Sequence, residues 1–105
     1  SVDFPDYADL VCQKITDLDS RGVLICGSGQ GMAMRANKYS HIRAALCWDL
    51  TTARLSREHN NANVLCIGSR LIPFGTAIEI LNLFLKTPFA GGRHENRVQK
   101  LSQPC

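Results

Sequence analysis

The chain has 105 residues and a mass of 11.6 kDa, enough for one domain that buries a hydrophobic core. Hydrophobic residues make up 45% of the sequence and charged residues 20%, which excludes a disordered chain and favours a soluble globular protein. The formal net charge of +3 is too small and too scattered for a nucleic-acid-binding stripe, and no apolar run approaches the roughly 18 residues of a membrane helix. We therefore expect neither nucleic acid nor a membrane as a partner, and the balance suits a small anionic ligand held by a few cations.

The cysteines indicate free thiols rather than disulfides or metal ligands. Their number, five, is odd, and no Cys–Cys or Cys–His spacing is typical of a zinc site. Three of them lie in apolar, strand-like runs, where a thiol behaves as a small hydrophobic group: Cys26, Cys47 and Cys66. This usage predicts a protein of the reducing cytoplasm.

Segments with helical periodicity alternate with short apolar runs along the chain. Asp6 is predicted to cap a first helix over residues 7–18, in which apolar residues recur at helical spacing up to Leu18. Three apolar runs, the first of them typical of a strand covered on both faces, predict strands at residues 23–26, 44–48 and 63–68. Further helices are predicted after residue 31 to about residue 37, and over residues 50–58, 73–86 and 93–101. This alternation predicts an α/β fold in which crossover helices cover a parallel sheet.

A glycine-rich segment, residues 27–31, joins the first predicted strand to the helix that follows it. Glycines let the backbone approach a ligand closely, and the free amides of the next helix favour an anion or a developing negative charge. The segment lacks the Gly-Lys-Ser/Thr of a Walker loop, and it departs from the GxGxxG pattern because Met32 occupies the third glycine position. We expect an anion or oxyanion site here rather than a plain turn. The glycines, with Asp49 farther along, also leave open a half-Rossmann nucleotide-binding module.

A few other side chains are candidates for chemistry, and each has a plainer interpretation. Cys26 ends the strand before the glycines, where a helix N-terminus favours a thiolate, but the residue also suits a buried core. His59, next to Asn60, is either a proton shuttle near neutral pH or, more commonly, a charge partner for the end of its helix. Arg93 and Arg97 lie one helical turn apart, so both guanidinium groups can bind one phosphate or form a solvated basic face.

Taken together, these stretches resemble the sugar-phosphate isomerase family that includes type B ribose 5-phosphate isomerase and the galactose 6-phosphate isomerase subunits. The resemblance covers essentially the whole chain and rests on separate motifs in the family's order, at residues 3–8, 22–32, 36–38, 42–47, 53–60, 63–66 and 91–94. It implies one sugar-phosphate isomerase domain over residues 1–105, with a Rossmann-like three-layer α/β/α fold built on a parallel sheet. It also implies no metal, no organic cofactor, and a cytoplasmic homodimer or tetramer whose active sites lie between chains.

The resemblance further implies an aldose–ketose isomerase that interconverts ribose 5-phosphate and ribulose 5-phosphate through a cis-enediolate. Cys26 matches the family's base, and Ser28 matches a catalytic position usually held by threonine. His59 matches the residue that opens the furanose ring, and Asn60 lies beside it. The remaining matches bind the substrate, through loop amides for the enediolate and arginines for the phosphate: Gly27, Gly29, Gly31, Arg70, Arg93 and Arg97.

The sequence departs from the family pattern at its start. Members of the family begin with a strand that carries an Asp-His pair, then a helix and a second strand, and only then reach the segment that resembles residues 3–8. We therefore expect a domain that lacks this N-terminal β-α-β portion and leaves strand edges unpaired. The alternative function is a non-catalytic truncated form or partner subunit that binds phosphosugar or completes another chain's site. The sequence leaves the identity of the sugar phosphate open.

Overall fold

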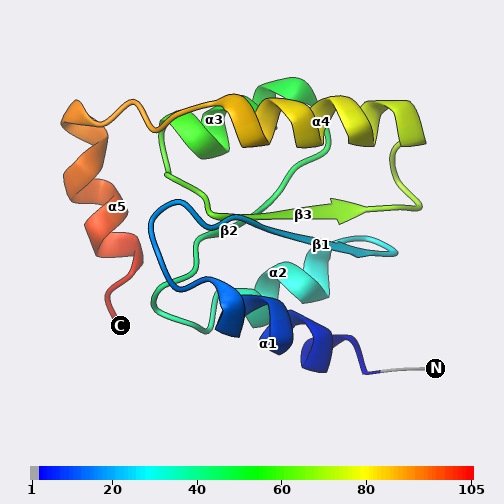
Figure 1. The fold of residues 1–105 in the computed structure, drawn as a ribbon, viewed down its shortest axis with the longest axis horizontal. Helices are drawn as coiled ribbons and strands as arrows, with labels where there is room; N and C mark the ends of the chain where they lie inside the picture. Colours follow the sequence, from blue (N-terminus) through cyan, green and yellow to red (C-terminus); the bar gives the residue numbers. More distant parts are fainter. Residues whose placement is uncertain (1–2) are drawn as a thin grey trace.

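The computed structural model describes residues 3–105 and consists of a three-stranded parallel sheet between two layers of helices (Figure 1). Its elements in chain order are α1 (Phe4–Lys14), β1 (Gly22–Cys26), α2 (Gln30–Ala36), β2 (Ala44–Leu46), α3 (Leu50–Glu58), β3 (Val64–Gly68), α4 (Phe74–Lys86), the 3₁₀ helix η1 (Gly92–His94) and α5 (Glu95–Leu101). This arrangement confirms the predicted α/β class with its parallel sheet. Among the described residues, no helix combines the length and the apolar character that crossing a membrane requires.

The central strand is β3, which has β1 on one side and β2 on the other. β1 pairs with it from Gly22 opposite Val64 to Cys26 opposite Gly68, and β2 pairs with its first part. Because all three strands run in the same direction, Cys26 and Gly68 lie together at the carboxyl edge of the sheet. This is the edge at which open α/β sheets bind ligands.

The side chains of β3 alternate between two hydrophobic cores, with the period of two that a strand imposes. Val64 and Cys66 pack into the first core, which α1 and α2 close with residues such as Ala8, Cys12, Met32 and Ala36. Leu65 and Ile67 pack into the second core, which α3 and α4 close with residues such as Ala53, Ile80 and Phe84. Both faces of β3 are therefore covered, which explains why its sequence is a continuous apolar run.

The first helix differs from its prediction at both ends. It spans Phe4–Lys14 and has Asp3 at its N-cap, because the Asp6 amide donates a hydrogen bond of 3.1 Å to the Asp3 carbonyl. The prediction of Asp6 as the cap is therefore wrong. Pro5 allows the early start, since its fixed φ suits a first turn and it has no amide hydrogen to leave unpaired there. The helix ends well before Leu18, whose side chain is 89% exposed rather than part of an apolar face.

Two other elements are shorter than predicted. β2 ends at Leu46, because the Trp48 amide donates to the Thr52 hydroxyl at 3.2 Å and so turns away from the sheet. The predicted last helix is divided into η1 and α5. The chain enters this tight turn through the left-handed backbone of Gly91 and Gly92, with φ of +70° and +57°; Gly92 is the first residue of η1.

The prediction that β1 is covered on both faces is wrong. Ile25 is 57% exposed, and with Val23 it lines an apolar groove of about 330 Å³. The other wall of this groove comes from β3 and from α4 and the turn before it, through Ile67, Ile72, Phe74, Ala77, Ile78 and Leu81. The strand is open because β1 is the edge of the sheet and α4 packs on the central strand.

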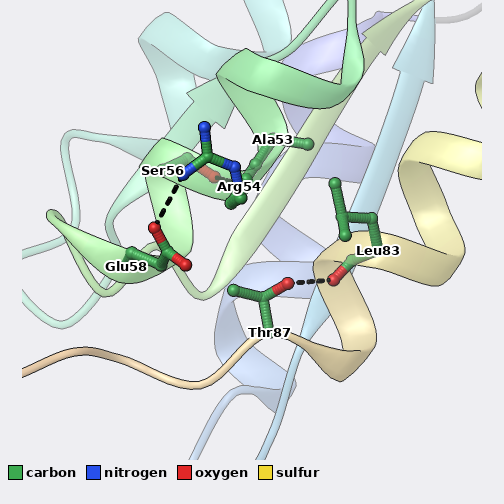
Figure 2. A network of polar contacts seen from close by, with 6 residues as sticks. All are labelled: Ala53, Arg54, Ser56, Glu58, Leu83 and Thr87. Carbon is green, nitrogen blue, oxygen red and sulfur yellow. Dashed lines mark hydrogen bonds and ion pairs between the residues drawn. The ribbon is translucent and has the colours of Figure 1, made fainter.

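The C-terminal ends of α3 and α4 lie side by side (Figure 2). In α3, Arg54 and Glu58 form an ion pair one turn apart, with 3.0 Å between Nη1 and Oε1. At the end of α4, the Thr87 hydroxyl donates to the Leu83 carbonyl at 2.7 Å and closes the last turn. The two segments that follow these helix ends, residues 59–62 and 88–94, carry three of the predicted site residues: His59, Asn60 and Arg93.

Candidate active site

Cys26 is the last residue of β1 and is half-buried at the carboxyl edge of the sheet. The Gly29 amide donates a hydrogen bond to its Sγ atom over 3.2 Å. A backbone N–H directed at a sulfur stabilises negative charge on it, which is the condition for a thiol to act as a base. The geometry thus favours the chemical interpretation of Cys26 over that of an inert core cysteine.

The loop after Cys26 presents further donors. Within residues 3–105, no hydrogen bond joins the backbone amides of Gly27 and Ser28 to another group of the protein. The Ser28 hydroxyl accepts a hydrogen bond of 3.4 Å from the Gln30 amide at the start of α2. Unpaired amides beside a sulfur are suited to bind an oxyanion that forms next to it.

Two glycines of the loop pack closely against other elements, and the backbone leaves no room for a side chain at Gly29. Gly29 has a left-handed backbone with φ of +78°, and a Cβ atom there would lie 2.6 Å from the Leu46 side chain and 3.0 Å from the Gly68 amide. A Cβ atom on Gly31 would lie 2.5 Å from the ring of Phe4. The number of glycines in residues 27–31 therefore reflects contacts with β2, β3 and α1, which the sequence did not reveal.

Arg70 lies beside this loop and adds a positive charge to it. Its amide donates to the Gly27 carbonyl at 3.1 Å, and the Ser69 amide donates to the Cys26 carbonyl at 2.8 Å. The guanidinium carbon of Arg70 is 3.7 Å from the position that a Cβ atom on Gly27 would take. The structure thus brings together the base candidate, its loop and one arginine at the carboxyl edge.

Asp49 serves as a helix cap. Its carboxylate accepts a hydrogen bond of 2.7 Å from the Thr52 amide, and the Thr52 hydroxyl accepts one from the Asp49 amide in return. This reciprocal capping box holds the pKa of Asp49 below its usual value, mainly through the Thr52 amide. In a half-Rossmann nucleotide-binding module, this carboxylate would have to bind the ribose hydroxyl of the nucleotide. Because the carboxylate caps α3 instead, the structure argues against a nucleotide-binding module.

The second group of predicted residues surrounds a pair of histidines. His59 is the C-cap of α3, and its ring stacks on that of His94 in η1, with centroids 4.3 Å apart and an interplanar angle of 15°. Burial, followed by the neighbouring His59, Arg93 and Arg97, lowers the pKa of His94. Asn60, next to His59, lines a cavity of about 300 Å³ whose other lining residues include Arg43 and Leu101.

Arg57 supports this second group, and sequence reasoning did not single it out. It is only 2% exposed, and its guanidinium donates to the carbonyls of Thr87 at 2.9 Å and Ala62 at 2.6 Å and to the side chain of Asn61 at 2.9 Å. Burial, and then the repulsion of Arg21 and Arg43, lowers its pKa to about 10. Its position four residues after the fully buried Ala53 was the available sequence signal, since that spacing shares one helix face.

The two groups of candidate residues lie at opposite ends of the parallel strands, the Cys26 group at the carboxyl ends and the His59 group at the amino ends. Cys26 ends β1, whereas His59 precedes β3, whose first residue pairs with the first residue of β1. Four residue steps of β1 separate these ends, a distance of roughly 13 Å at the rise of a strand. In Figure 1 the glycine-rich loop follows β1 at one end of the molecule and α5, which carries Arg97, projects at the other. One copy of the chain therefore keeps these two groups of candidate residues apart.

Comparison with known proteins decides the family. The model of the Ribose/Galactose Isomerase family matches residues 1–101. The chain belongs to this family of isomerases. The resemblance and the Rossmann-like three-layer fold that it implied are thereby confirmed.

Solved structures of this isomerase family are similar over nearly the whole chain. Ribose 5-phosphate isomerase B from Anaplasma phagocytophilum is 56% identical, with a TM-score of 0.92, over 96% of this chain and 69% of that one. The enzyme of the same name from Thermotoga maritima is 51% identical, with a TM-score of 0.93, over 97% of this chain and 71% of that one. Ribose-5-phosphate isomerase B of Escherichia coli K12 is 40% identical over 102 residues, which are 95% of this chain and 68% of the relative. The chain thus spans about 70% of the length of these isomerases.

Proposed function

We propose that this chain is an aldose–ketose isomerase that interconverts ribose 5-phosphate and ribulose 5-phosphate, with Cys26 as the base. The observation that carries the proposal is the hydrogen bond of 3.2 Å from the Gly29 amide to the Cys26 sulfur. Because of this bond, the Cys26 sulfur lies against the loop whose Gly27 and Ser28 amides have no hydrogen-bond acceptor within residues 3–105. A substrate carbon beside the sulfur would thus have its oxygen beside hydrogen-bond donors.

The proposed reaction is a proton transfer between neighbouring carbons. The Cys26 thiolate removes the proton from C2 of the open-chain aldose, and the C–H electron pair becomes the C1–C2 double bond of a cis-enediolate. The negative charge that develops on O1 is stabilised by the loop amides. The Cys26 thiol then returns the proton to C1, while the Ser28 hydroxyl passes the O2 proton to O1 and leaves a carbonyl at C2. A positioned base of this kind contributes roughly 10² to 10⁴ in rate.

The His59 group is proposed to bind the phosphate and open the sugar ring. His59 donates a proton to the ring oxygen, since imidazole exchanges protons near neutral pH. Asn60 lies beside it and contacts the sugar, and Arg93 and Arg97 bind the phosphate oxygens. Arg70, which lies in the Cys26 group, completes the phosphate pocket where the two groups meet. Binding the phosphate at a distance from the reacting carbons orients those carbons over the base.

We propose a homodimer, because one copy keeps the two groups at opposite ends of its parallel strands. The Cys26 group of one copy then meets the His59 group of its partner. Mixing Cys26→Ala protein with His59→Gln protein tests this arrangement. Mixed dimers would contain one intact site each, so activity should recover to about a quarter of the wild-type value after random exchange of subunits. No recovery, although the variants exchange subunits, contradicts the shared site.

The assignment of the base has its own test. Cys26→Ala should abolish ribose 5-phosphate isomerisation, whereas Cys105→Ala, which removes an exposed thiol near the end of the chain, should leave it unchanged. Activity that survives Cys26→Ala contradicts the proposed mechanism.

A non-catalytic partner subunit is the second candidate. The observation that favours it is the open edge of β1, where Ile25 is exposed beside an apolar groove that another chain could cover. Calorimetry with ribose 5-phosphate, combined with an isomerase assay, separates the two functions. Binding without turnover selects the partner subunit, and turnover selects the enzyme.

A further inference from the structure

His94 is the aromatic neighbour of His59, and nothing in the proposed reaction has yet used it. The two rings are nearly parallel, at 15°, with centroids 4.3 Å apart. Stacked aromatic rings at such a separation restrict each other's orientation. His94 belongs to η1 and lies between Arg93 and Arg97 in the sequence, so this contact joins α3 to the segment that carries both arginines.

Two hydrogen bonds, one between backbone groups and one from a side chain, hold the segment of His94 against the end of α3. The Ala90 amide donates to the Glu58 carbonyl at 3.0 Å, one residue before His59. Arg57, two residues before His59, donates to the Thr87 carbonyl at 2.9 Å. The stack therefore joins two segments that are also connected by hydrogen bonds outside the two rings.

The charges around His94 favour a neutral ring. The groups that face it are His59 from the end of α3, Arg93 from η1 and Arg97 from α5, all of them basic. Burial, and then these neighbours, lower the pKa of His94, which favours the uncharged form of the ring. An uncharged ring stacks on His59 whether His59 is neutral or protonated, whereas a second cation would repel a protonated His59.

We propose that His94 is a positioning residue for His59: its ring, stacked on that of His59, sets the orientation of the histidine and ties it to the segment that carries the two arginines. This role rests on the proposed function, in which His59 must present one nitrogen to the ring oxygen of the sugar. A free imidazole ring at the C-terminus of a helix would rotate about its χ bonds. The stacked ring restricts that rotation and leaves the edge of His59 available.

Proton NMR of the histidine rings tests the proposal on the whole chain. The comparison uses wild type, His94→Phe, which keeps a flat uncharged ring, and His94→Ala, which removes the ring. The ring protons of His59 should be shifted upfield by stacking in wild type and His94→Phe and should lose this shift in His94→Ala. His41→Gln is the matched control, because His41 also lies near the amino edge of the sheet but contacts Tyr39 instead of His59.

The kinetic prediction separates positioning from general stability. In His94→Ala, kcat for ribose 5-phosphate should fall roughly tenfold or more with KM nearly unchanged, and His94→Phe should restore most of the loss. Equal His59 spectra in wild type and His94→Ala overturn the proposal, as does a His94→Phe enzyme no better than His94→Ala. If the wild-type chain has no isomerase activity, the proposed function fails, and the ring shifts alone still decide whether His94 orients His59.

Discussion

The backbone amide of Gly29 points at the sulfur of Cys26, three residues earlier, with 3.2 Å between the nitrogen and the sulfur. This direction depends on the left-handed backbone of Gly29, whose φ is +78°. At Gly29, the space that a side chain would occupy is taken by the Leu46 side chain and the backbone of β3. The electrostatic environment of the sulfur is therefore set by the close packing of the loop on the sheet.

Gly29→Ala should destabilise the protein and impair isomerisation together. The new Cβ atom would lie 2.6 Å from Leu46 and 3.0 Å from backbone atoms of β3, in a backbone conformation that disfavours side chains. We expect a loss of roughly 2 kcal/mol or more in the free energy of unfolding, measured by urea titration. Gly75→Ala is the matched control, because it lies in α4 with no atom near the added methyl group, and it should stabilise by up to about 1 kcal/mol. Equal effects of the two changes contradict this account.

Arg57→Met should be among the most destabilising single substitutions. It leaves one buried carbonyl, one partly buried carbonyl and one amide oxygen without their donor, and we expect a loss of roughly 3 kcal/mol in the free energy of unfolding. Arg54→Met on the same helix removes only an exposed ion pair and should cost no more than about 0.5 kcal/mol. Chemical denaturation of the two variants measures the difference, and a similar midpoint for both would count against the structural role of Arg57.

Stability should decrease as the pH falls below about 4, the usual range of aspartate. The pKa of Asp9 is lowered by hydrogen bonds from Arg35, and that of Asp17 by hydrogen bonds from Ser20 and the Asp19 amide. A carboxylate with a lowered folded-state pKa binds protons more readily in the unfolded state, so its stabilising contribution is present above the unfolded pKa and lost on acidification. Thermal unfolding from pH 7 to pH 2 checks this, and Arg35→Gln should weaken the dependence by removing the partner of Asp9.

The five thiols should react in two classes at pH 8. Cys105 is exposed and Cys26 is half-buried, so both should react rapidly with a disulfide reagent in the native protein. Burial raises the pKa of the other three thiols, that of Cys66 to about 12, and should protect them until the protein unfolds: Cys12, Cys47 and Cys66. The Cys26→Ala variant should lose one rapid thiol. Rapid reaction of more than two thiols in the native wild type would show that the cores open readily.

Much of the fold follows from local sequence pattern. The continuous apolar run of β3 is typical of a strand covered on both faces, and the spacing of Ile80 and Phe84 in α4 identifies its buried face. The cap of α3 is also a local feature, because the Asp49 carboxylate directly before the helix satisfies a free amide of its first turn. These features depend on neighbours within a few positions, which the sequence displays directly. The family motifs are likewise runs of adjacent residues.

The arrangement of the candidate site was decided by tertiary structure. Cys26 and His59 belong to one series of motifs along the chain, yet the fold places them at opposite ends of the parallel strands. The stack of His59 on His94 joins residues 35 positions apart, and Arg57 reaches Thr87 across 30 positions. Such contacts depend on how helices pack on the sheet, which is a property of the whole fold. Periodicity along the chain therefore predicted the elements but not these partners.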